Sequence, residues 1–117
     1  MATVAITPTT LVSETPSATL PIASGTAINT ANTNTFAYPR EGKLVLQVNN
    51  TTAAAKIFTV AAGTFCASGK GDLATSMAQD EVYFLVVDGD RHKNNSGLVS
   101  VTYESGMTGF IQALYVP

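Results

Sequence analysis

Few side chains of this sequence could do chemistry. The only histidine, His92, and the only cysteine, Cys66, are the candidates for a base and a thiol nucleophile. Nucleophilic catalysis needs a base beside its Ser or Cys, and an acid that orients the base. His92 lies in a polar segment with Lys and Asn neighbours, and nothing in the spacing brings it to Cys66. We therefore expect a solvated loop histidine, and a cysteine that packs as a small buried or half-buried hydrophobe.

The segment Asp88-Gly89-Asp90 suggests a calcium site, because hard cations take carboxylate oxygens from tight turns that contain glycine. It lacks the further ligands and the distal Glu of a calcium loop, and the neighbouring cations Arg91 and Lys93 would oppose a metal ion. We expect a turn that ends a strand and holds no metal.

Two further patterns resemble catalytic sites only weakly. Asp80, Glu81 and Glu104 could supply the paired carboxylates of a glycosidase, but the chain has no Trp on which a sugar could stack. The glycine-rich segment 69–72 lacks the spacing of a phosphate-binding loop. The sequence therefore predicts a protein that is not an enzyme and that uses no cofactor.

The charge content limits the partners. Six Lys and Arg stand against eight Asp and Glu, and only 12% of the residues are charged, roughly half the usual fraction. Nucleic-acid binding would need a clustered basic face, so we expect no nucleic-acid partner. No apolar run is long enough to cross a membrane, and the start lacks the layout of a secretory signal. A surface so poor in charge is cheap to desolvate, which suits a protein that packs against others.

Alternating apolar residues and turn residues predict an all-β fold. The expected strands lie at 35–38, 43–49, 55–61, 72–77, 82–87, 98–103 and 109–116. The strands at 43–49 and 55–61 should form a hairpin, and 82–87, which is apolar on both faces, should be a central strand. With no amphipathic helix in the pattern, we expect a compact β-sandwich or barrel of six to eight short strands.

The first third of the chain differs from the rest. Residues 1–34 contain one charged residue, Glu14, and three prolines, which disfavour helices and remove strand hydrogen bonds. We expect an extended N-terminal arm at 1–34 and a β domain at 35–117. The arm could wrap its own domain, or it could lie on a neighbour. In the second case its partner-binding side chains would be the apolar ones, namely Ile6, Leu11, Val12, Leu20 and Ile22.

Three segments carry a resemblance: Glu41–Leu46, Val86–Arg91 and the final Gly109–Pro117. They resemble small virion proteins of tailed bacteriophages and prophages, and the chain is most similar to a head decoration, or cement, protein. The resemblance implies a β-rich structural protein, made in the host cytoplasm, that binds the major capsid protein on the capsid exterior. It also implies self-association, with a trimer favoured.

Two other classes of function remain open. One is another virion part, such as a tail-tube, head–tail connector or fibre-base component. A tail-tube protein would form rings through a long hairpin loop, whereas the loops here are expected to be short. The other is a module that binds cell-surface carbohydrate, for which four Tyr and five Phe are available as stacking platforms.

Overall fold

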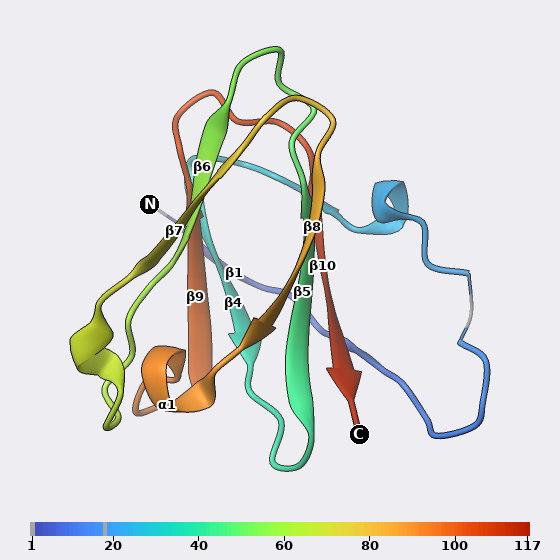
Figure 1. The fold of residues 1–117 in the computed structure, drawn as a ribbon, viewed down its shortest axis with the longest axis vertical. Helices are drawn as coiled ribbons and strands as arrows, with labels where there is room; N and C mark the ends of the chain where they lie inside the picture. The colour runs from blue at the N-terminus through green and yellow to red at the C-terminus, as the bar shows by residue number, and fades with distance from the viewer. Residues whose placement is uncertain (1, 18) are drawn as a thin grey trace.

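The computed structural model describes residues 2–17 and 19–117, which form two mixed sheets packed face to face (Figure 1). Sheet A contains, in order, β1 (Ala2–Ala5), β4 (Asn32–Ala37), β9 (Leu98–Tyr103), β6 (Lys56–Val60) and β7 (Leu73–Met77). Sheet B contains, in order, β2 (Thr9–Thr10), β10 (Phe110–Val116), β5 (Lys43–Asn49) and β8 (Val82–Val87), and β3 (Thr26–Ala27) also pairs with β10. The short helices are α1 (Gly89–His92), η1 (Ile22–Ser24) and η2 (Ser68–Lys70).

The predicted all-β class is confirmed, as a sandwich; the described residues form no closed barrel. The ten strands exceed the six to eight expected, because β1, β2 and β3 lie in the segment predicted to be an extended arm. The expected boundary between residues 34 and 35 falls inside β4.

The core lies between the facing sides of the two sheets. Successive side chains of a strand point to opposite faces, and on β5 the alternation is clear: Leu44, Leu46 and Val48 are buried, whereas Lys43 is exposed. The other buried apolar side chains come from both sheets and the loop before β10: Phe36, Phe58, Val60, Met77, Val87, Val99, Val101, Tyr103, Met107, Ile111 and Ala113.

The predicted hairpin of 43–49 and 55–61 is wrong. Both strands form, but β5 lies between β10 and β8, whereas β6 lies in the other sheet between β9 and β7. The buried side chain of Asn50 explains the crossing. Its Nδ2 donates to Met77 O at 2.8 Å and to Ala54 O at 3.1 Å, so the connection after β5 is fastened to the end of β7.

The prediction that 82–87 is a central strand is also wrong. β8 is the last strand of sheet B, and β5 is its only pairing neighbour among the described residues. Its inner side chain Val87 is buried, whereas Val82, Phe84 and Val86 on the outer face are exposed. An all-apolar strand suggested cover on both faces, but here the outer cover is missing.

Residues 2–10 form a strap across one open edge of the sandwich. β1 pairs in parallel with β4, and β2 pairs in parallel with β10, so the strap runs from sheet A to sheet B. Between the two strands, Ile6 N donates to Thr35 O at 2.9 Å and the Ile6 side chain packs against the core. The first part of the arm therefore binds its own domain (Figure 1).

Candidate functional site

His92 is not the solvated loop histidine that we expected. It ends helix α1 and is buried, with Nδ1 lying 3.0 Å from Ala61 O. Because a carbonyl oxygen only accepts, Nδ1 must carry the proton of this hydrogen bond. The ring therefore attaches α1 to the end of β6, which is a structural role.

Cys66 differs from its prediction in the opposite direction, because it is exposed and unpaired. It lies in the loop between β6 and β7, where the Phe65 side chain is also exposed. Lys93 Nζ lies 5.0 Å from the centre of the Phe65 ring and 5.5 Å from that of Tyr38, so a cation–π contact holds this loop against the end of α1. Nothing in this geometry activates the thiol.

The Asp88-Gly89-Asp90 segment forms the start of α1 rather than a simple turn. Asp88 is the N-cap residue, and its Oδ1 accepts from Asp90 N at 2.9 Å. The described residues contain no group of three or more His, Cys, Asp or Glu side chains arranged to hold a metal ion. The partner of the Asp88 carboxylate is thus the backbone of Asp90, and its role is to cap α1.

Of the other acidic candidates, Glu81 and Glu104 accept hydrogen bonds from groups near them in the sequence or sheet, whereas Asp80 is exposed. Glu81 accepts from Ala78 N at 2.6 Å and from the Tyr83 hydroxyl at 2.8 Å, and Glu104 accepts from Ile57 N at 3.2 Å. The hydrogen bond to Glu81 raises the pKa of the Tyr83 phenol. Both carboxylates thus fasten turns at strand ends.

The segment 69–72 follows the same pattern. Asp72 Oδ1 accepts from Ala62 N at 2.7 Å, and Arg91 Nε donates to Gly71 O at 3.0 Å. Among the backbone donors that a phosphate loop would aim at a ligand, Lys70 N donates instead to Ala67 O at 3.2 Å. These contacts close the loop.

The five arm residues proposed to bind a partner are divided between places: Ile6 and Leu20 line one pocket, whereas Leu11 lines another. Ile6 packs against the core of its own domain, whereas Leu11, Leu20 and Ile22 are half-buried. Val12 is 61% exposed, and residues 13–17 after it are also exposed. Among these five side chains, Val12 is therefore the one most available to another molecule.

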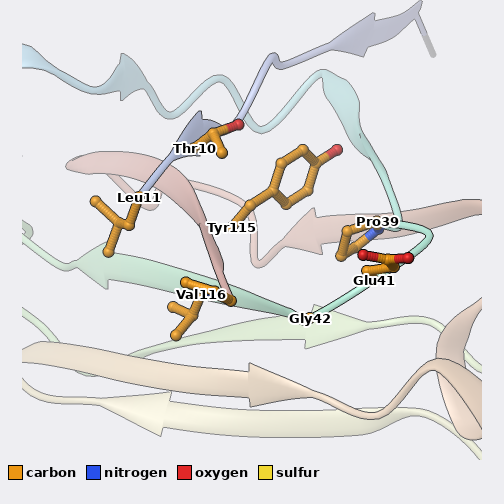
Figure 2. Close-up of a pocket in the computed structure, with 8 residues that line it drawn as sticks. Thr10, Leu11, Pro39, Glu41, Gly42, Tyr115 and Val116 are labelled. Atoms are coloured by element: carbon orange, nitrogen blue, oxygen red, sulfur yellow. The ribbon is translucent and has the colours of Figure 1, made fainter. Parts of the chain in front are cut away.

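A pocket of about 320 Å³ lies beside this exposed part of the arm. Figure 2 shows the Tyr115 ring between the strap residue Thr10 and the turn that contains Pro39. The wall is completed by Leu11, Glu41, Gly42, Val116 and Pro117.

The turn beside this pocket requires glycine. Gly42 has φ +81°, and a Cβ on it would lie 2.2 Å from Val116 O, so only glycine allows the turn to approach β10 this closely. Tyr115 donates its hydroxyl hydrogen to Ala37 O, and burial raises the pKa of its phenol. The pocket thus has mainly apolar walls and one carboxylate, that of Glu41, and suits an apolar group of a partner.

The second candidate surface is the β8 stripe, which consists of Val82, Phe84 and Val86. Their side chains are 43%, 65% and 57% exposed. The neighbouring strand places the uncharged Val45 and Gln47 opposite Val86 and Phe84. The stripe itself is apolar, and charged side chains flank its Val86 end, where Lys43 and Asp88 line a pocket together with Val86.

The arm covers the outer face of sheet B at β10, on the side away from β8. Gln112 of β10 donates to Gln47 Oε1 and to Leu20 O, which places the Leu20 backbone over β10. Helix η1 packs against β10 and β5, whereas Phe84 and Val86 of β8 are well exposed. The β8 side of the face is therefore left open by the described part of the arm.

No protein-family model matches the chain, and neither curated proteins nor solved structures give a significant match. Within the described residues, no helix is both long and apolar enough to pass through a membrane.

Proposed function

We propose that this protein is a non-enzymatic structural protein of a tailed-phage virion, which binds the major capsid protein on the capsid exterior and stabilises the shell. The observation that carries the proposal is the exposed arm segment that begins at Val12, next to the apolar pocket of Leu11 and Tyr115. It presents an exposed apolar side chain beside a cavity that an apolar side chain of a partner would fit.

The proposed mechanism is mass action. A protein that binds the assembled lattice, and not its separated subunits, stabilises the lattice at every occupied site. The exposed residues 12–17 would become ordered on the shell, which costs chain entropy, and the low charge of the surface keeps the desolvation cost small.

Two observations favour this role over the alternatives. The loop between β6 and β7 does not project as a free hairpin, because Gly63 N donates to Arg91 O and Thr64 N donates to Lys93 O. That argues against a tail-tube protein. The most exposed aromatic side chain, Phe84, lies between Val82 and Val86 on its strand, and the amide of Gln47 opposite it already accepts from Gln112, so this surface is less suited to a sugar.

The test is co-sedimentation with expanded capsids of the phage or prophage that encodes the chain. We expect Val12→Lys to weaken capsid binding at least about tenfold, since it places a charge at the proposed contact. Ile57→Lys is the matched control, because Ile57 is an exposed apolar residue on sheet A, and it should bind like the unchanged protein.

Two further measurements separate the rival functions. Protease cleavage within the exposed residues 12–17 should disappear when capsids are present, as expected for an arm segment that is covered by the shell. Density for this chain away from the capsid exterior, in electron cryo-microscopy of the particle, would contradict the proposal. A hexameric ring in native mass spectrometry would support a tail tube, and glycan-array hits would support a carbohydrate-binding module.

A further inference from the structure

β8 has the features of a strand that accepts another strand. It ends sheet B, and Val82, Phe84 and Val86 lie exposed on its outer face. No residue of β8 is charged, and its outer neighbours on β5 are Val45 and Gln47. Natural edge strands are normally protected by charge, proline or a bulge, and β8 contains no charged residue or proline.

The hydrogen-bond pattern shows which backbone groups of β8 face outward. In an antiparallel pair, opposite residues alternate between those that exchange hydrogen bonds and those that do not. The β5–β8 register extends to Asn50 opposite Glu81, and Asn50 N donates to Glu81 O at 3.2 Å. Every second residue from Glu81 onward thus faces β5, and the N–H and C=O groups of Val82, Phe84 and Val86 face the open edge.

We propose that two copies of this chain pair through β8, antiparallel, about a two-fold axis at Phe84. The residue order argues for a second copy as the occupant, because Val82-Tyr83-Phe84-Leu85-Val86 is nearly palindromic. Antiparallel pairing then sets Phe84 against Phe84 and Val82 against Val86. These side chains lie on the same face of the joined sheet, and the outward N–H and C=O groups of one copy face those of the other. A two-fold contact needs this self-complementarity.

The order of the apolar residues 82–86, rather than the charges at the ends of the strand, favours this register. A shift by two residues in one direction would set Asp80 against Val86, and in the other direction Asp88 against Val82. Either shift would oppose a carboxylate to an apolar side chain. In the centred register Asp80 and Asp88 of the two copies meet outside the paired residues 82–86. Their repulsion weakens the dimer, so the end charges alone do not favour the centred register over the shifted ones.

Sheet B of one copy and sheet B of the other would become one continuous sheet. In each copy Val45 would extend the apolar face next to Val86. The paired strand is short, so the interface is smaller than the standard ~1,600 Å² and we expect a dissociation constant of about 10–100 μM. This contact does not depend on capsid binding.

The first test is sedimentation equilibrium of the isolated full-length chain. We expect monomer and dimer to exchange over that concentration range. Phe84→Lys should weaken the dimer at least about tenfold, and Asp80→Asn should strengthen it by removing the end repulsion. Ile57→Lys, on the other sheet, should leave it unchanged. A monomer at all concentrations, a trimer, or equal effects of Phe84→Lys and Ile57→Lys would overturn the proposal.

The second test reads the register. In a Cys66→Ser background, Phe84→Cys should form an intermolecular disulfide with oxidised glutathione, because hydrogen-bonded partners have Cα atoms about 5.5 Å apart, within disulfide range. Val86→Cys is the matched control. Its two copies would be offset by four residues, about 14 Å along the strands, and should not cross-link. Equal cross-linking at both positions would refute the two-fold axis at Phe84. Neither test involves capsids, so failure of this dimer is separable from failure of the proposed function.

Discussion

Tyr103 and Asn34 form a buried polar pair that joins two neighbouring strands of sheet A. The Tyr103 hydroxyl donates to Asn34 Oδ1 at 2.6 Å, and both residues are buried. Burial raises the pKa of the Tyr103 phenol above its ordinary value near 10. The charged form would lose hydration and would also lose the hydrogen that Asn34 accepts.

The pair gives a prediction for alkaline pH. Because the folded-state pKa is raised, the unfolded chain releases the Tyr103 proton first, and the stabilisation is complete below pH about 10 and falls as the pH rises further. The loss should approach about 1.4 kcal/mol per pH unit for this one proton. Urea unfolding at a series of pH values from neutral to alkaline, with phenolate absorbance recorded, measures it.

Tyr103→Phe is the informative variant for this prediction. At neutral pH it should be less stable by about 1–3 kcal/mol, since Asn34 Oδ1 is left buried without a donor. Its stability should then fall less steeply above pH 10, so that the two curves converge. Parallel curves would show that Tyr103 does not carry the effect. Part of the slope should persist, because burial also raises the pKa of Tyr115.

Single residues also show where sequence reasoning ends. The neighbours of His92 are polar and those of Cys66 are small and apolar, which predicted an exposed histidine and a buried thiol. The structure reverses both, because burial here depends on which loop packs on which helix. Those contacts join residues about thirty apart, such as His92 and Ala61, and no local pattern encodes them.

At the scale of elements, the sequence predicted strand positions well and strand partners poorly. The strands at 82–87 and 98–103 begin and end as expected. Periodicity reports which residues share a face, but not which strand lies alongside. The hairpin failed for that reason. The prediction that 82–87 is a central strand failed because an uncovered edge strand and a fully covered central strand are equally apolar. The residues of the β8 stripe could thus be located in the sequence, but the exposure of their side chains could not be predicted.

The crossing after β5 depends on Asn50, which gives a second prediction. Its Nδ2 donates two hydrogen bonds, and its Oδ1 accepts from Thr52 N. Asn50→Asp keeps the shape but sets a buried carboxylate against the carbonyls of Met77 and Ala54. We expect a loss of about 3 kcal/mol or more in the free energy of unfolding.

Asn95→Asp is the matched control for that measurement by chemical denaturation. Asn95 is exposed, and its Oδ1 accepts from Thr64 Oγ1, a role that a carboxylate retains. Its effect should stay within about 0.5 kcal/mol. Equal effects of the two substitutions would mean that the amide of Asn50 does not hold the crossing.

At the scale of the whole molecule, the arm divides into a bound and an exposed part. The strap pairs with the edge strands β4 and β10, and so protects an edge of each sheet. Residues 12–17 after it belong to no strand, and the arm pairs with the sandwich again at β3, which lies against β10. The sequence left open whether the arm wraps its own domain or binds a neighbour. The strap follows the first course, and the second remains a proposal for the exposed part.

The division predicts opposite results for two similar substitutions. Ile6→Lys places a charge where the strap packs against the core, so we expect a loss of about 2–4 kcal/mol in the free energy of unfolding. The strap should also detach, with loss of hydrogen-exchange protection at the amides of residues 2–6. Val12→Lys, in the same arm, should leave both the stability and that protection unchanged, because Val12 is exposed. Hydrogen exchange followed by mass spectrometry measures the protection of residues 2–6 in both variants. If Ile6→Lys left the strap protected, the sandwich edge would not depend on this side chain, and the strand pairing alone would have to hold it.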